Sequence, residues 1–551
     1  MKRIIITLIS IVCIQLLRAQ NPLVKQWDYR FGGTLQEYIY SLQQTADGGY
    51  ILGGYSLSDS SGDKTENSWG GYDYWIIKID SLGTKQWDKD FGGSADERLY
   101  SLQQTTDGGY ILGGTSSSGI SGDKTEPNWD SINFSHDFWV VKIDSLGTKQ
   151  WDKDFGGTAN DYIVSLQQTM DGGYILGGNS VSGISGDKTE ANWDNLGFTN
   201  DYWIVKIDAL GNKQWDKDLG GTGDDLLASV KQTTDGGYLL AGLSSSGADG
   251  NKTEASKGQI DYWVIKTDSL GLVQWDKDFG GTLNDILYSM QTTTDGGAVL
   301  AGVSASGISG DKTQANWDNS NGTNDYWVVK IDSLGTKQWD KGLGGTIGEP
   351  KFGNISQTID GGFLVSGISY SSISGNKTEN NLGIEQIWVV KTDSLGGVQW
   401  DKTVYTTSED ECGYAIETKG GCYLMANNTH AGIGGYKTQE GWGSFEDFWV
   451  VKFCDTSIAT GFNSSFQLAY QLSAYPNPFT SEITIAFNDQ NAGHISLVVH
   501  DVLGQEVFTM HENKTTANYT KTIDLQLLSR GIYFLEVNMD GERRMTKIVK
   551  E

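Results

Sequence analysis

Histidine, proline and cysteine are scarce in this 551-residue sequence, which has 5, 5 and 4 of them. Few histidines leave few candidates for acid–base catalysis near neutral pH. Only His136 and His430 precede residue 455, and their polar surroundings predict solvated loops. We find no metal-ligand cluster, phosphate-binding loop or nucleophile elbow. Catalysis is therefore uncertain and not favoured, although Asp is abundant and a carboxylate pair that cleaves glycans stays open.

Basic residues are also few, with 41 Lys and Arg against 69 Asp and Glu and a net charge of −28. Binding to nucleic acid relies on clustered Lys and Arg, so nucleic acid is not expected as a partner. A divalent cation or a neutral glycan suits this surface better. Calcium is conceivable at acidic residues of the long loops, but no Asp-x-Asp-x-Asp-Gly loop occurs, and we expect no cofactor. The residues considered for calcium are Asp63, Asp123, Asp187 and Asp311.

A long apolar run is absent except at the N-terminus, where Ile4 to Leu17 follows Lys2 and Arg3. This run is too short for a membrane span, and Ala19 before Gln20 is a plausible cleavage point. Residues 1–19 therefore predict a signal peptide for export to the periplasm. We expect no transmembrane segment in the mature chain.

Three cysteines remain after the leader, namely Cys412, Cys422 and Cys454. An odd number in an exported chain predicts one disulfide and one free thiol. Cys422 begins one predicted strand and Cys454 ends the next, so antiparallel pairing favours a Cys422–Cys454 bond. Buried free cysteines are the alternative.

Aromatic residues and glycine are plentiful, and they recur with a period. Close copies of Gln-Trp-Asp-Lys-Asp-Phe-Gly-Gly return every 60 to 64 residues. Such a unit is too small to bury its own apolar surface and must stack on its neighbours. The seven anchoring tryptophans are Trp27, Trp87, Trp151, Trp215, Trp275, Trp339 and Trp400.

Each repeat predicts a four-stranded antiparallel meander. In the third, residues 164–169, 174–178, 202–207 and 213–218 have strand character, and glycine-bearing turns join the first to the second and the third to the fourth. The middle strands are apolar on consecutive residues, which indicates a sheet covered on both faces. Radial packing of seven such sheets predicts a seven-bladed β-propeller over residues 24–455.

The ends of the repeat array favour ring closure. It begins with a lone fourth strand, residues 24–31, and finishes at a third strand, residues 448–453. We expect the N-terminal strand to complete the last blade, because this pairing removes exposed sheet edges. An open solenoid is the structural alternative.

The long loops between second and third strands contain a Lys-Thr pair in every repeat. We expect these pairs to brace the blades, with Lys pairing to an acid and Thr to the loop backbone. The segments that follow are more variable, and Trp129, Trp193 and Trp317 within them are candidate ligand-binding residues, because a tryptophan face suits a sugar ring. The alternative is that these rings fold back onto their own blades. The lysines of the seven Lys-Thr pairs are Lys64, Lys124, Lys188, Lys252, Lys312, Lys377 and Lys437.

The turn Asp80-Ser81-Leu82-Gly83 and its relatives have Asp to cap the turn and Gly for positive φ. The turn also resembles an acceptor for O-glycosylation in some Gram-negative bacteria. Turn chemistry explains the motif, and glycosylation of Ser81 stays open.

The repeats stop after Asp455. Residues 456–471 predict a polar linker, and residues 472–551 contain short alternating strands typical of a small β-sandwich. Four motifs in this segment resemble the type A C-terminal sorting domain of the type IX (Por) secretion system. They are Tyr475-Pro476-Asn477-Pro478-Phe479, Asp501-Val502-Leu503-Gly504-Gln505-Glu506-Val507, Gly531-Ile532-Tyr533-Phe534-Leu535 and Lys547-Ile548-Val549-Lys550.

The resemblance implies the type IX secretion machinery as a partner, with Pro476, Asn477, Pro478, Gly504, Gly531 and Lys547 as motif residues. It also implies export across the outer membrane, usually with removal of the domain and release or attachment at the cell surface. The repeats are more loosely similar to Asp-Gly-Gly-Tyr propeller-like repeats of secreted proteins. Read without the family, the module is a small terminal sandwich that could equally bind a ligand.

These features predict an all-β, monomeric, secreted or surface-attached protein. Its leading function is non-enzymatic binding or adhesion to a glycan or a surface protein through the long-loop side. A secreted carbohydrate-active enzyme and a structural surface-layer component are the alternatives.

Overall fold

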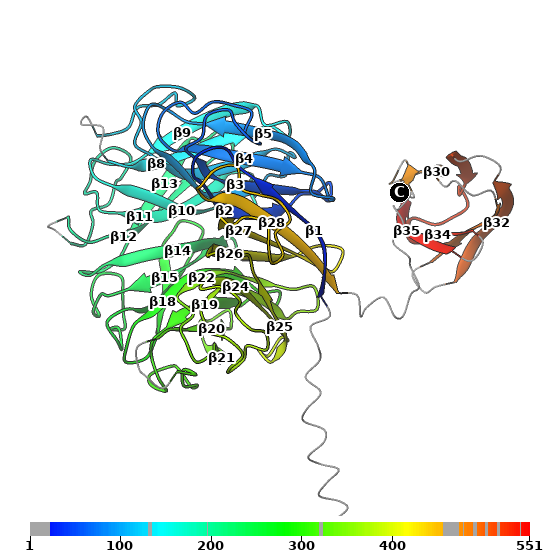
Figure 1. The fold of residues 1–551 in the computed structure, drawn as a ribbon. Helices are drawn as coiled ribbons and strands as arrows, with labels where there is room; N and C mark the ends of the chain where they lie inside the picture. Colours follow the sequence, from blue (N-terminus) through cyan, green and yellow to red (C-terminus); the bar gives the residue numbers. More distant parts are fainter. Residues whose placement is uncertain are drawn as a thin grey trace, which may run out of the picture. The chain divides into compact units, whose positions relative to one another are not determined.

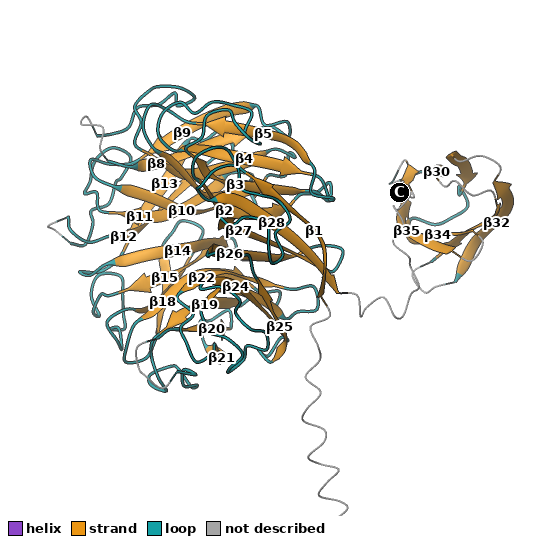
Figure 2. Ribbon diagram, viewed as in Figure 1, coloured by secondary structure: helices purple, strands orange, loops and turns teal. Residues whose placement is uncertain are grey.

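The computed structural model describes residues 23–130, 135–194, 197–318, 323–455, 473–475, 477, 479–488, 493–501, 505–514, 518–539 and 542–550. Within these ranges the chain is all β, with strands joined by turns and loops and no helix (Figure 2). Contacts divide it into two units, with the boundary between Ser457 and Ile458. The all-β prediction is confirmed.

The first unit contains seven four-stranded antiparallel sheets among its described residues. Sheets one to three contain β2 (Glu37–Gln44), β3 (Tyr50–Ser56), β4 (Asp73–Ile79), β5 (Lys85–Phe91), β6 (Glu97–Gln104), β7 (Tyr110–Ser116), β8 (Asp137–Ile143), β9 (Lys149–Phe155), β10 (Asp161–Gln168), β11 (Tyr174–Ser180), β12 (Asp201–Ile207) and β13 (Lys213–Leu219). Sheets four to six contain β14 (Asp225–Gln232), β15 (Tyr238–Ser244), β16 (Asp261–Thr267), β17 (Val273–Phe279), β18 (Asp285–Thr292), β19 (Ala298–Ser304), β20 (Asp325–Ile331), β21 (Lys337–Leu343), β22 (Lys351–Gln357), β23 (Phe363–Ser369), β24 (Gln386–Thr392) and β25 (Val398–Val404). Sheet seven contains β26 (Asp410–Glu417), β27 (Cys422–Thr429), β28 (Asp447–Asp455) and β1 (Leu23–Phe31).

The strands of a repeat are longer than the sequence predicts, mainly at one end. In sheet three the first strand begins at Asp161 instead of residue 164, and the second ends at Ser180 instead of residue 178. Asp161 and Ser180, at the ends of the added stretches, are polar but buried, and they pair with each other at the end of the ladder. Apolar patterning alone does not mark such residues as strand.

The turns between third and fourth strands follow the predicted chemistry. Asp80 Oδ1 accepts hydrogen bonds from the backbone N–H groups of Leu82 and Thr84, at 2.9 Å each. Gly83 has φ of 88°, a region that favours glycine, and it lies against Tyr29. Ser81 is exposed on this turn.

Sheet seven is built from both ends of the first unit. β1 pairs antiparallel with β28, with Leu23 opposite Asp455 and Phe31 opposite Phe448. The final fourth-strand position is therefore occupied by the segment that precedes the first complete repeat.

Neighbouring sheets contact each other through their first strands. β2, β6, β10, β14, β18, β22 and β26 make contact in that order, and β2 also contacts β26. Figure 1 labels β2, β10, β14, β22 and β26 toward the middle of this unit and β5, β9, β21 and β25 at its margin. This is a propeller-like arrangement of sheets.

Aromatic pairs stabilise the packing between successive third strands. Tyr74 of sheet one lies against Trp139 of sheet two, with ring centroids 4.8 Å apart. The same contact links each sheet to the next as far as sheet six, and Phe448 of sheet seven packs on Trp75 of sheet one at 5.0 Å. These rings are fully buried, which accounts for the consecutive apolar residues of the third strands.

The described residues of the second unit form two antiparallel sheets. One consists of β29 (Ser473–Tyr475), β30 (Glu482–Asn488) and β33 (Asn518–Asp524), and the other of β32 (Glu506–Lys514), β31 (Gly493–His500), β34 (Gly531–Met539) and β35 (Glu542–Lys550). Residues of both sheets share one core, including Ile485, Ile523, Leu497 and Leu535. Residues 483–487, 495–499 and 532–537, whose apolar alternation predicts strands, lie in β30, β31 and β34, whereas the weaker alternation of β29, β32, β33 and β35 does not predict them.

Candidate functional site

The predicted binding residues Trp129, Trp193 and Trp317 lie in the long loops of sheets two, three and five. Their side chains are 49%, 44% and 47% exposed. Trp69 of sheet one and Trp442 of sheet seven occupy the same place, and the sequence reading missed both. All five follow the lysine of the Lys-Thr pair by five positions, a spacing that could have revealed them. We call Trp69, Trp129, Trp193, Trp317 and Trp442 the rim tryptophans.

Each rim tryptophan is anchored between two sheets. The backbone N–H of Trp129 donates to Asp137 of its own sheet at 2.8 Å, and its indole Nε1 donates to Asp187 in the loop of the next sheet at 2.6 Å. Trp317 repeats this pattern with Asp325 and Asn376, at 2.8 Å each. Its ring lies close to Gly375, where a Cβ atom would meet the indole at 2.9 Å. The rings therefore lean on the following sheet instead of folding back on their own, and about half of each stays in solvent.

The Lys-Thr pairs form the buried base of these loops. The Thr65 N–H and hydroxyl both donate to Asp88, which also accepts a hydrogen bond from Trp75 Nε1 at 3.1 Å. Equivalent Thr–Asp–Trp contacts occur in all seven sheets. The threonine thus bonds a fourth-strand carboxylate rather than the loop backbone, because the loop folds over that strand. The equivalent aspartates are Asp28, Asp88, Asp152, Asp216, Asp276, Asp340 and Asp401.

In sheets one to four the lysine of the Lys-Thr pair forms an ion pair with a second, deeper carboxylate. Lys64 and Asp90 lie 2.5 Å apart, and both are buried. Burial raises the pKa of Asp90 to about 9, with the Lys64 ammonium opposing the shift and Asp73 adding to it. The partners in the next three sheets are Asp154, Asp218 and Asp278.

Sheet five breaks this pattern. Gly342 stands where sheets one to four have the deeper aspartate, and Lys312 instead donates to Ser304 Oγ at 2.8 Å and to Asn316. Burial lowers the pKa of Lys312 to about 8. Gln314 stands where five other sheets have glutamate, and its Oε1 accepts a hydrogen bond from the Gly342 N–H at 3.0 Å.

The change at Gln314 also removes the partner of Lys341. In sheets one to four and six the equivalent lysine pairs with that glutamate, as in Lys153–Glu126 at 2.5 Å. Among the residues that the structure describes, no carboxylate lies within ion-pair distance of Lys341. The ion pairs at this position in the other sheets are Lys89–Glu66, Lys217–Glu190, Lys277–Glu254 and Lys402–Glu379.

A cavity of about 540 Å³ lies at this point, between sheets five and six. Its walls come from the long loop of sheet five, from β21, and from the loop and turn of sheet six. The lining residues are Gln314, Ala315, Trp317, Lys341, Gly342, Leu343, Asn376, Gly396 and Val398. We call this cavity the β21 groove.

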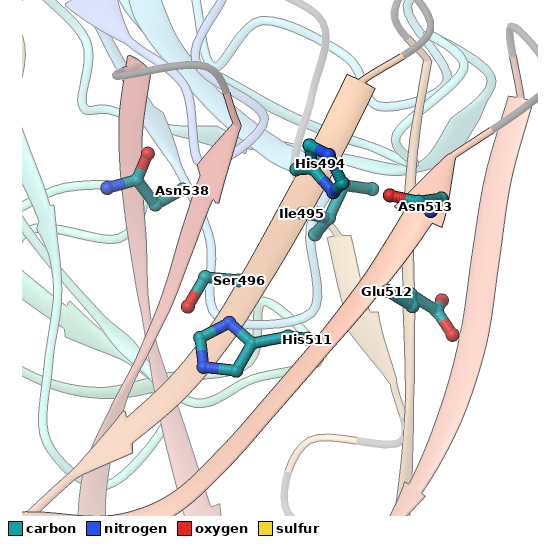
Figure 3. A pocket seen from close by; sticks show the side chains of 7 residues that line it. All are labelled: His494, Ile495, Ser496, His511, Glu512, Asn513 and Asn538. Carbon is teal, nitrogen blue, oxygen red and sulfur yellow. The ribbon is translucent and has the colours of Figure 1, made fainter.

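A second cavity, of about 580 Å³, lies on the β31–β32–β34 sheet of the C-terminal unit. Figure 3 shows His494, Ser496, His511 and Asn538 around it. Ser496 pairs with His511 across the two strands. Glu512 points away from the histidines and accepts hydrogen bonds from Tyr519 and Lys521, so among the described residues that line this cavity no carboxylate contacts His511.

One serine–histidine contact is a candidate nucleophile and base pair. Ser408 Oγ and His430 Nε2 lie 2.7 Å apart on loops of sheet seven. Nucleophilic catalysis also needs a group that orients the imidazole, and within the described ranges no carboxylate contacts His430. The contact alone does not make an active site.

In the described part of the chain no group of three or more His, Cys, Asp or Glu side chains is placed to hold a metal ion. Nor does that part include a helix with the length and hydropathy to cross a bilayer.

The remaining predicted residues lie as follows. Cys422 and Cys454 are joined by a disulfide, and they are register partners on β27 and β28. Asn477 Oδ1 accepts a hydrogen bond from the Val549 N–H at 2.8 Å. Gly531 begins β34, and Lys547 lies on β35 opposite Phe534. Pro476, Pro478 and Gly504 lie outside the described residues.

Residues 473–551 match the family model of a secretion system C-terminal sorting domain. This match indicates a secreted or cell-surface protein handled by the type IX machinery. It agrees with the resemblance drawn from the four motifs.

Other similarities are more distant. Regulatory protein FlaEY of Caulobacter vibrioides is 28% identical over 198 residues, which cover 35% of this chain and 19% of that protein. A protein of unknown function from Dyadobacter fermentans aligns with a TM-score of 0.40 and 11% identity, covering 79% of this chain and all of that one. The Pan2 WD40 domain of Neurospora crassa aligns with a TM-score of 0.42 and 10% identity, covering 78% and 95%.

Proposed function

We propose that the first unit is a seven-bladed β-propeller, closed by β1, that binds a glycan or a surface protein without catalysis. Closure is supported by the place of β1 in sheet seven and by the contact of β2 with β26. The sorting domain would deliver this module to the cell surface or the medium. Residues 1–19, as a signal peptide, would direct the preceding step into the periplasm.

The observation that carries the binding proposal is the arrangement of the rim tryptophans. The backbone N–H and the indole N–H both donate hydrogen bonds in Trp129, Trp193, Trp317 and Trp442. Trp69 donates from its backbone N–H, and its ring lies against Gly122, so each exposed face is held in place. A fixed aromatic face binds with little loss of side-chain entropy and suits a sugar ring or an apolar side chain. Five such faces in equivalent positions favour a repetitive ligand.

The test is binding of the full mature chain to a glycan array and to surface proteins in pull-down. We expect Trp129→Ala, Trp193→Ala and Trp317→Ala, combined, to reduce binding at least about tenfold, the effect of losing buried aromatic contacts. The matched control is Leu146→Ala, Leu210→Ala and Leu334→Ala, which truncates three exposed apolar residues on turns at the other end of the strands. Equal binding by both triple variants would refute the proposal.

A secreted hydrolase is the second candidate, favoured only by the Ser408–His430 contact. Turnover on a polysaccharide panel distinguishes it from saturable binding without turnover. A structural surface-layer role predicts neither.

A further inference from the structure

We propose that the β21 groove binds an acidic sugar residue, with the pyranose ring on Trp317 and the carboxylate at Lys341. This inference rests on the proposed binding function and names a ligand class for one site within it. It is specific to sheet five and does not require the other rim tryptophans.

The charge of the groove is the first argument. Relative to sheets one to four, sheet five has lost two carboxylates, one at Gly342 and one at Gln314. Both lysines remain. In a chain of net charge −28, this leaves the half-buried Lys341 ammonium without the carboxylate that its counterparts have. An anionic ligand can take the place of that carboxylate and form a charge-assisted hydrogen bond.

The space in the groove is the second argument. A Cβ atom added at Gly342 would have no heavy atom nearer than 3.9 Å, so the missing side chain leaves room that neighbouring residues do not fill. The cavity of about 540 Å³ lies within the size range of small-molecule sites. It can accommodate one or two sugar rings.

The lining chemistry selects a sugar over a peptide. Trp317 offers an indole that is 47% exposed, and Gln314 and Asn376 add amide groups of the kind that pair with hydroxyls. The Trp317 indole N–H already donates a hydrogen bond to Asn376, which fixes the ring against rotation. A flat fixed aromatic face, flanked by amides and by a Lys341 ammonium that has no carboxylate partner among the described residues, matches a pyranose that bears a carboxylate.

The experiment measures binding of the full mature chain to three probes by calorimetry. They are trigalacturonate, its carboxyl-reduced counterpart and triglutamate. We expect trigalacturonate to bind at least about tenfold more tightly than either other probe, and its affinity to fall with salt, because the ion pair is partly exposed. Equal affinity for the reduced sugar, tighter binding of triglutamate, or no binding of trigalacturonate would overturn the inference.

Two restoring variants test the location. Gln314→Glu recreates the glutamate that pairs with lysine in five other sheets, and Gly342→Asp recreates the deeper aspartate. Each should weaken trigalacturonate binding at least about tenfold while the thermal unfolding midpoint is retained. Lys153→Met, at the equivalent lysine of sheet two, is the matched control and should leave the affinity unchanged.

The outcomes separate this inference from the wider function. If Gln314→Glu and Gly342→Asp bind trigalacturonate like the parent chain, the groove is not the site, even when the triple tryptophan variant loses array binding. If the parent chain binds nothing on the array or in pull-down, the proposed function fails as well.

Discussion

The indole Nε1 of Trp449 donates a hydrogen bond to Oδ2 of Asp28, at 3.1 Å across 421 residues of chain. Thr438 donates to the same carboxylate from its backbone N–H and its hydroxyl, at 2.8 Å each. In sheet two Asp152 makes the same contacts with Trp139 and Thr125. The N-terminal strand therefore supplies sheet seven with the group that every other sheet takes from its own repeat.

The first prediction concerns Asp28→Ala. We expect it to destabilise the first unit by about 3 kcal/mol or more, because a buried carboxylate with several charge-assisted hydrogen bonds is lost and its donors are left unpaired. Hydrogen exchange should also become faster in residues 23–31 and at their partners on β28, since β1 is the first described strand of the chain and can open locally.

Asp152→Ala is the control for this effect. It removes the same contacts from an internal strand, so a similar loss of stability should come without selective exchange at β1. Unchanged protection of β1 in Asp28→Ala would contradict the role of Asp28 in holding the ends together.

The second prediction concerns the disulfide. Replacing both Cys422 and Cys454 by serine should lower the free energy of unfolding by about 3–4 kcal/mol, from the chain entropy of a crosslink across 32 residues. Chemical denaturation of the oxidised parent and the double variant measures this difference. The reduced parent should resemble the double variant, and a parent indifferent to reduction would argue against the bond.

The third prediction concerns pH. Burial raises the pKa of Glu37, Asp225 and Asp410 to about 7, from ordinary values of 4.5 for Glu and 3.8 for Asp. Between about pH 4 and about pH 7 the folded chain therefore holds protons that the unfolded chain has released, so the stabilisation that is complete at lower pH is lost as the pH rises through this range. We expect the thermal unfolding midpoint to fall between about pH 5 and about pH 8.

Glu37→Gln and Asp225→Asn check this assignment, since an amide does not titrate. The combined variant should show a flatter pH profile than the parent over the same range. A midpoint that rises toward pH 8 in the parent would show that other groups dominate.

The fourth prediction concerns Ser408. We expect no labelling by a fluorophosphonate probe above the level of Ser408→Ala, because in the described part of the chain no carboxylate orients the His430 ring that faces this hydroxyl. In-gel fluorescence of the two proteins is the measurement. Labelling that depends on both Ser408 and His430 would favour the hydrolase alternative.

Much of the fold could be predicted from the repeats. Trp151 and its counterparts marked the period, and the apolar runs of the middle strands predicted sheets covered on both faces. The disulfide partners also followed from strand register, because Cys422 and Cys454 occupy the ends of adjacent strands. The polar first residues of strands, such as Asp161, were missed, because their burial depends on contacts outside the local pattern.

The candidate binding residues could be predicted only in part. Trp129, Trp193 and Trp317 were selected for their variable surroundings, whereas Trp69 and Trp442 were missed although they keep the same spacing from the Lys-Thr pair. Gly342 and Gln314 are visible in the sequence as departures from the repeat. Their meaning depends on Lys341, Trp317 and Asn376 converging on one cavity from two sheets.

The sequence by itself determined the all-β class, the repeat length and the sorting motifs, because these follow from local periodicity and from residues close in the chain. Only the tertiary structure decided that each rim tryptophan leans on the following sheet, that Asp28 accepts the Trp449 hydrogen bond, and that sheet five contains a groove whose lysine pairs with no carboxylate in the described part of the chain. The physical reason is that these contacts join residues from different repeats. Near-identical repeats offer many equivalent partners, and packing selects among them.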